Sequence, residues 1–263
     1  MTVVAFGSSL GGFAVPPALG LLLADFGWQT AYRLAAAFIV IVAAPVIYCA
    51  LAPYAANYPR GVRARETGSR FGWMGSIVAT RAFWALSIGM FSLSVGLSGV
   101  QHSLAPFARE QGLSIERSAL LISFLSVSMI AGKLFWIAVI DRMSEMRYFT
   151  LMAGAVIVGL LILQAAAGTV QICVGLFVLG LAGGGTAQFI PMSASRHFGF
   201  DRLGRALSLA LIPISLSAVG APLAGFAFDI SGSYRISFAM FAGIAIVGLG
   251  AFGILSRRGG VPG

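Results

Sequence analysis

The stretch GAPLAGFAFDISGSYR, residues 220–235, decides the fold, because its pattern occurs a second time near the start of the chain. Residues 16–33 read PPALGLLLADFGWQTAYR. In both stretches an apolar run with a proline leads to an Asp, and a turn with a glycine and an aromatic residue follows. Pro222 lies 205 residues after Pro17, and the two turn glycines keep the same offset. Self-similarity at a fixed offset indicates a duplicated structural unit.

The composition assigns the chain to the membrane. Of its 263 residues 59% are hydrophobic and 10% are charged, and the mean hydropathy is +0.94, whereas a soluble domain has about 25% charged residues. About 20 apolar residues cross a bilayer. The uncharged stretch 148–195 is longer than one span, and small residues in AAAGTVQ (165–171) predict a break there. We expect an all-α polytopic membrane protein with eight transmembrane helices, near 3–23, 32–52, 82–104, 118–140, 148–166, 170–192, 206–228 and 236–256.

The repeat offset predicts how these helices are divided. A unit of 205 residues holds about six membrane helices with their loops. Only two of the expected helices precede the basic segment 54–81, and six follow it. We therefore interpret 1–53 as the last two helices of an N-terminal bundle, 54–81 as a cytoplasmic loop, and 82–258 as a complete six-helix C-terminal bundle. On this interpretation the chain is incomplete and lacks four preceding helices.

The arginines predict the orientation. Loops rich in Lys and Arg stay in the cytoplasm, so both termini are expected inside, in a bacterial-type inner (plasma) membrane. This topology and anionic lipid account for the net charge of +9 without a nucleic-acid partner. The richer side carries Arg60, Arg63, Arg65, Arg70, Arg81, Arg142, Arg147, Arg196, Arg202, Arg205, Arg257 and Arg258, and the other side Arg33, Arg109, Arg117 and Arg235.

The sequence places no group of residues where they would form a catalytic site. His102 and His197 fall at opposite ends of the membrane, and the eight carboxylates fall in loops or at helix ends, so no acid–base pair or metal cluster is expected. The GGG at 183–185 lies in mid-membrane without the Lys and Ser or Thr of a phosphate loop. We predict no enzyme, cofactor or metal site. Proton carriers commonly bury a carboxylate in their path, so any proton coupling is assigned to the missing helices.

Three segments together resemble the major facilitator superfamily, and within it the monocarboxylate-porter-like branch. They are GAPLAGFAFDISGSY, DFGWQTAY (25–32) and HFGFDRLGRAL (197–207). The resemblance covers nearly the whole chain, as helices five to twelve of the usual twelve. It implies a secondary transporter that moves a small organic anion, such as a monocarboxylate, by alternating access. A separately encoded N-terminal helix bundle would then be a partner.

The loop after the expected helix 118–140 carries a further part of the resemblance. The family pattern there is G-x-x-x-D-R-x-G-R-R, and this chain reads IAVIDRMSEMR (137–147). Asp141 and Arg142 match, which implies that they belong to a gating loop. Ile137 replaces the expected glycine, and Ser144, Glu145 and Met146 also depart from the pattern.

Lys133, in MIAGKLFWIAVIDRM (129–143), is the only lysine of the chain. It stands eight residues before Asp141, as the basic residue of the branch does before its helix end. Placing such a cation in an apolar membrane helix costs about 2.5 to 3.5 kcal/mol. Lys133 lies about 12 Å from the helix end. We expect Lys133 to bind the substrate anion. Weaker candidates for lining the cavity are Ser87, Phe91, Ser94, Gln101, His102, Ser128 and Ser215.

Other interpretations remain open at this stage. Each of the weaker candidates is also explained by helix packing, and Lys133 by snorkelling to the membrane surface. The glycines at 11, 12, 180, 183–185, 220 and 225 predict close helix packing through small residues. The chain as a whole fits a non-transporting membrane-embedded remnant or a partner subunit of the same fold, or a channel or receptor-like protein.

Overall fold

A computed structural model describes residue 22 and residues 27–57 and 72–257. This part of the chain consists of helices and their connections, and seven helices are long and apolar enough to cross a membrane. The seven spans are Gly27–Cys49, Arg81–Glu110, Ile115–Arg142, Glu145–Ala165, Thr169–Gly199, Arg202–Ser231 and Tyr234–Ser256.

The spans confirm the predicted all-α membrane fold. Each of the seven predicted helices from 32–52 onward overlaps one of them, and the break expected in AAAGTVQ falls between Ala165 and Thr169. The predicted helix 3–23 lies outside the described residues, apart from residue 22.

The helix that starts at Gly27 passes through a π-helical turn, η1, into α2. The bounds are η1 Ile39–Ala43, α2 Ala44–Asn57, α3 Gly72–Val78, α4 Arg81–Glu110, α5 Ile115–Val139, η2 Ile140–Arg142, α6 Glu145–Ala165, α7 Thr169–Ser215, η3 Leu216–Val219, α8 Gly220–Ser231 and α9 Tyr234–Arg257.

Local sequence sets several helix ends. The side-chain oxygens of Thr80, Ser114 and Ser144 accept the backbone N–H groups three residues later at the starts of α4, α5 and α6, so each satisfies a donor that has no partner within the helix. Gly232 ends α8 in the left-handed conformation with φ of 72°, which glycine adopts without steric cost.

Two interruptions divide the segment after residue 169. Gly199, at φ of 71°, kinks α7 between the two spans that it joins. The predicted single helix 206–228 is broken near its middle by the 3-10 turn η3, which lies between Pro213 and Pro222. Pro222 has no N–H to donate to the carbonyl of Ala218, which lies four residues earlier in η3, so the regular α pattern fails there.

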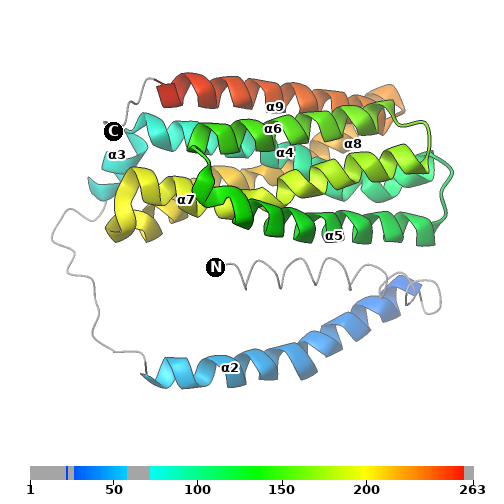
Figure 1. Ribbon diagram of the computed structural model, residues 1–263. Coiled ribbons are helices and arrows are strands. Elements are labelled where there is room, and N and C mark those ends of the chain that lie inside the picture. The colour runs from blue at the N-terminus through cyan, green and yellow to red at the C-terminus, as the bar shows by residue number, and fades with distance from the viewer. Residues whose placement is uncertain (1–21, 23–26, 58–71, 258–263) are drawn as a thin grey trace.

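The six spans from α4 to α9 pack as one bundle (Figure 1). α4 contacts α5, α7, α8 and α9, while α6 contacts α7 and α9. Aromatic side chains fill the interior, with ring centroids 3.9 Å apart for Phe149 and Phe252 and 4.9 Å apart for Phe107 and Phe238. These contacts tie the two ends of the sequence segment 81–257 together through α4, α6 and α9.

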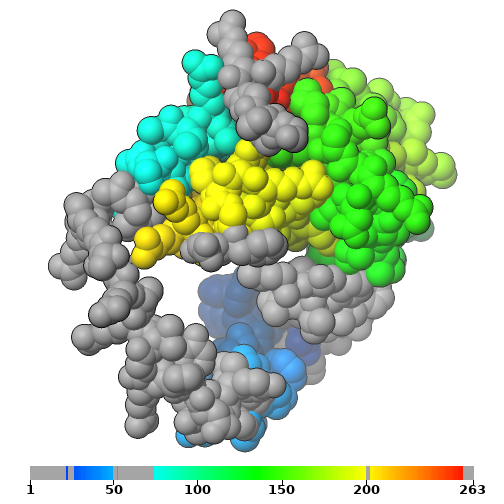
Figure 2. All heavy atoms as spheres, turned by 60° about the vertical axis from the view of Figure 1, so that its left-hand side comes forward, coloured from blue at the N-terminus to red at the C-terminus, as the bar shows by residue number. Residues whose placement is uncertain are grey.

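The helix of residues 27–57 lies apart from this bundle (Figures 1 and 2). None of the 18 residues in its most apolar stretch is buried. The expected loop 54–81 is helical at residues 54–57 and in α3. Ile77 of α3 packs in a cluster with Phe83, Ala194 and Ala206, so this short helix covers one end of the bundle.

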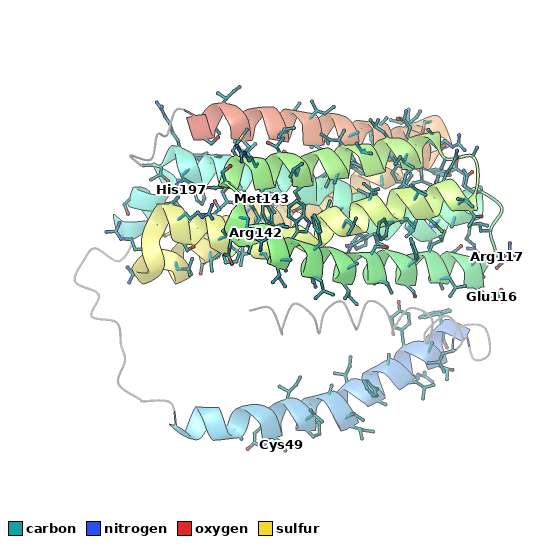
Figure 3. The ribbon with its side chains drawn as sticks, in the orientation of Figure 1. Cys49, Glu116, Arg117, Arg142, Met143 and His197 are labelled. Atoms are coloured by element: carbon teal, nitrogen blue, oxygen red, sulfur yellow. The ribbon has the colours of Figure 1, made fainter. Side chains whose placement is uncertain are left out.

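The described arginines of the bundle gather at two ends. Helix bounds place Arg81, Arg142, Arg147, Arg196, Arg202 and Arg205 at one end, which we call the arginine-rich end, and Arg109, Arg117 and Arg235 at the other. Figure 3 shows Arg142 and His197 toward the left of the bundle and Arg117 at its right-hand end. The split between ends matches the charge pattern that predicted the orientation.

Candidate functional site

Lys133 lies on α5 in a tightly packed part of the bundle, with only 5% of its surface exposed. Its backbone lies directly against Gly184 of α7, where an added Cβ would lie 2.5 Å from the backbone nitrogen of Lys133. One turn earlier, Gly180 faces Ser128 in the same way, and Gly132 faces the backbone at Leu181. Small residues therefore let the two helix backbones touch, and this contact fixes the depth of Lys133.

Two aromatic residues, one on α5 and one on α6, hydrogen-bond to the same glycine segment. The Trp136 indole N–H donates to the Leu181 carbonyl at 2.8 Å, and the Tyr148 hydroxyl donates to the Gly185 carbonyl at 3.0 Å. The rings of Trp136 and Tyr148 lie 4.3 Å apart. Sequence reasoning missed both roles, because these donors serve carbonyls 45 and 37 residues away.

The predicted residues of α4 form a polar stripe on one helix face. With Ser98 included, Ser87, Phe91, Ser94, Ser98 and Gln101 follow one another at spacings of three or four residues, and His102 stands four residues after Ser98, so all of them lie along one side of the helix. Exposure grows along the stripe, from buried Ser87 through half-buried Phe91 and Ser94 to exposed Gln101 and His102.

Near its exposed end the α4 stripe approaches α5. The Gln101 amide donates to the Met129 sulfur at 3.6 Å, and Met129 is one turn before Lys133. A His102 ring nitrogen lies 2.8 Å from the Ser98 carbonyl oxygen of its own helix. The structure thus brings Gln101 to the α5 face that leads to Lys133, while the imidazole of His102 stays with its own helix.

The two remaining serines differ in their surroundings. Ser128 is buried at the α5–α7 contact, and its hydroxyl donates to the Phe124 carbonyl at 2.8 Å. Ser215 is exposed at the end of α7, and its hydroxyl donates to the Leu211 carbonyl at 2.8 Å. Both hydroxyls are satisfied within their own helices, and Ser128 also serves close packing.

Two buried polar groups stand out within the described residues. The Ser87 hydroxyl and both polar atoms of the Gln188 amide are buried without a hydrogen-bond partner there. Counted from the arginine-rich end of each helix, Ser87, Lys133 and Gln188 lie at depths of about 9, 12 and 16 Å. We call these three residues the polar layer, since their depths along the bundle differ by only about 7 Å. Gln188 was not predicted, although it is an isolated amide in an apolar run.

Asp141 and Arg142, the predicted gating-loop residues, lie exposed in η2. Nearby, Glu145 at the start of α6 joins α7: the Ser193 hydroxyl donates to it at 2.5 Å, and the His197 ring nitrogen Nε2 lies 2.9 Å from its other oxygen. The sequence analysis did not foresee this carboxylate–imidazole pair, because its members are 52 residues apart. Its geometry links two helices at the arginine-rich end.

Comparisons with known proteins agree with this architecture. None of the curated proteins compared with the sequence matches it. Among solved structures, one match is a bacterial homolog of the human lysosomal transporter Spinster, in an inward-facing and unoccupied conformation. The TM-score is 0.57 at 17% sequence identity, and the match covers 95% of this chain and 64% of that one. The likeness concerns the fold, and this chain spans less than two thirds of the length of that protein.

A family model identifies the chain independently of that fold. The model of the Major Facilitator Superfamily matches residues 1–210, which is well over half of the sequence. This superfamily is non-enzymatic, as the absence of a catalytic constellation in the sequence predicted. Its members bind small solutes and sit in lipid. The protein is therefore a multi-pass membrane protein with a secondary-transporter fold, and it belongs to the major facilitator superfamily.

Proposed function

We propose that the protein transports small organic anions, such as monocarboxylates, by alternating access, and that Lys133 binds the anion. The observation that carries this proposal is the position of Lys133, which is buried in α5 against the α7 glycines. Its side chain reaches about 6 Å, half the distance of about 12 Å to the helix end, so snorkelling does not bring its ammonium to bulk water.

The electrostatics of the site favour an anionic substrate. A cation in a low-dielectric layer attracts an approaching anion more strongly than one in water, because the surroundings screen the charges less. The ammonium of Lys133 is a point charge, whereas the guanidinium of Arg grips a carboxylate at two points. A point charge places fewer demands on the shape of the anion, which supports a range of small carboxylates as substrates.

The remaining polar layer supplies neutral contacts. Ser87 and Gln188 contribute a buried hydroxyl and a buried amide, and buried polar groups stay in proteins when something hydrogen-bonds to them. We assign the α4 stripe, from Ser87 to Gln101 and His102, to the wall of the substrate path. Asp141 and Arg142 would act at the gating loop. Ser128 and Ser215 are weaker candidates, since both hydroxyls already donate within their helices.

The test compares Lys133→Ala with Lys133→Arg in an uptake assay with radiolabelled lactate and a neutral sugar as control solute. The four helices expected to precede this chain are supplied by fusion or co-expression, and the chain alone is measured in parallel. We expect saturable lactate uptake, lost in Lys133→Ala at normal membrane insertion and partly restored in Lys133→Arg.

Four results would count against the proposal or one of its parts. Normal anion uptake and affinity in Lys133→Ala would make the lysine structural. Flux that does not saturate with substrate would indicate a channel. Saturable uptake by the chain alone would overturn the expectation of four further helices, unless oligomers of the chain build a substitute path. No uptake in any form would favour a non-transporting remnant or subunit.

A further inference from the structure

An open groove of about 560 Å³ lies at the arginine-rich end, between the end of α5 and the start of α6. Arg142 and Met143 line it on one side and Arg147 and Leu151 on the other. Figure 3 shows Arg142 and Met143 where the chain passes from α5 to α6, and Figure 2 shows green atoms of this part of the chain at the surface. This groove is separate from the polar layer around Lys133.

Two arginines line the groove at its rim, and the exposed carboxylate of Asp141 directly precedes Arg142 in the chain. Arg142 and Arg147 are both exposed, and neither forms an ion pair with another residue of the described chain. Glu145 lies between them in sequence, yet its carboxylate is held on α7 by Ser193 and His197. The nearest acidic group in the first turn of α6 is therefore engaged elsewhere, and the two guanidiniums remain available for an anion.

Below the rim the surface is apolar along one helix face. Leu151, Val158 and Leu161 of α6 are 53%, 50% and 45% exposed, and their spacing continues the face on which Arg147 stands. From Arg147 to Val158 the helix rises about 16 Å, which is about half of the 30 Å hydrocarbon thickness of a bilayer. The charged rim and the apolar face thus have the proportions of one membrane leaflet.

We propose that this groove binds an anionic phospholipid of the membrane. Its phosphate would lie between Arg142 and Arg147, whose planar guanidiniums suit two-point contacts with phosphate oxygens. One acyl chain would follow Met143, Leu151 and Val158 toward the membrane centre. Basic pockets between membrane helices are suited to such headgroups, and a free phosphate would leave the apolar face uncovered.

The test titrates the purified full chain, in a non-ionic detergent, with phosphatidylglycerol or phosphatidylcholine of the same acyl chains, and counts bound lipid by native mass spectrometry. We expect saturable binding of phosphatidylglycerol and much weaker binding of phosphatidylcholine. The double variant Arg142→Gln/Arg147→Gln should weaken phosphatidylglycerol binding about thirtyfold. The matched control, Arg196→Gln/Arg202→Gln, removes the same charge from the same end and should stay within about twofold.

Two further variants and a competition experiment with phosphate complete the test. If the double Gln variant does not fold, Arg142→Lys/Arg147→Lys replaces it, and its loss of the planar contact should weaken binding several-fold. Leu151→Ser should weaken the binding of the long-chain lipid. Equal binding of the two lipids, unchanged affinity in the Arg142/Arg147 variants, or the same loss in the control pair would overturn the proposal. Displacement of the lipid by millimolar inorganic phosphate would also overturn it, because the site would then select the free anion.

Discussion

Gly184→Ala tests the contact that positions Lys133. An added Cβ at Gly184 would lie 2.5 Å from the backbone nitrogen of Lys133 and 2.5 Å from the carbonyl oxygen of Met129. Ordinary contacts between non-bonded atoms have their optimum at about 3.5 to 4.0 Å, so the overlap is about 1 Å on each atom. Both obstructing atoms belong to the backbone of α5. The overlap therefore cannot be relieved by a side-chain rotation, and α5 and α7 must separate.

The cost follows from the packing of the bundle. Inserting a methyl group into a filled interior destabilises a protein by about 1 to 3 kcal/mol. For a domain of this size that lowers the midpoint of thermal unfolding by about 2 to 12 °C. The separation of the helices also moves Lys133 away from its site, so anion affinity should fall together with stability.

Gly154→Ala is the matched control. Gly154 lies inside α6, and an added Cβ there meets nothing within 4 Å. The same chemical change should leave stability unaltered or raise it by about 0.5 to 1 kcal/mol, because alanine loses less backbone entropy in a helix. Thermal unfolding in detergent, followed by tryptophan fluorescence, measures both variants. Equal midpoints for Gly184→Ala and the wild type, or equal losses in both variants, would refute the packing argument.

Two further predictions concern the ends of the bundle. Glu145→Ala and His197→Ala should each destabilise the protein, and a double-mutant cycle of unfolding should give a coupling of about 0.5 to 1 kcal/mol, as for other partly exposed pairs; strictly additive losses would show that the 2.9 Å contact contributes nothing to stability. A reporter fused after Arg258 should be active only in the cytoplasm and one inserted near Gln111 only outside, because arginine-rich loops stay inside; the opposite pattern would reverse the orientation.

The sequence by itself determined the membrane class, the seven described spans and the segregation of the arginines. These properties depend on the length of apolar runs and on charge between them, and both are local in the chain. The break in AAAGTVQ was predictable for the same reason. The interruption at η3 was not predicted, although Pro213 and Pro222 stand on either side of it, because prolines in membrane helices often bend the helix without ending the α pattern.

Tertiary structure decided how the site residues meet. The contact of Lys133 with Gly184, the donors from Trp136 and Tyr148, and the Glu145–His197 pair all join helices that are far apart in the chain. The groove with Arg142 and Arg147, by contrast, is lined by the contiguous segment 139–151, and tertiary structure enters there only because Glu145 is held on α7. An apolar pattern tells which residues lie in the membrane, but hydrophobicity does not distinguish a lipid-facing side of a helix from a protein-facing one. Only the packing of the backbones selects which small and polar residues face each other.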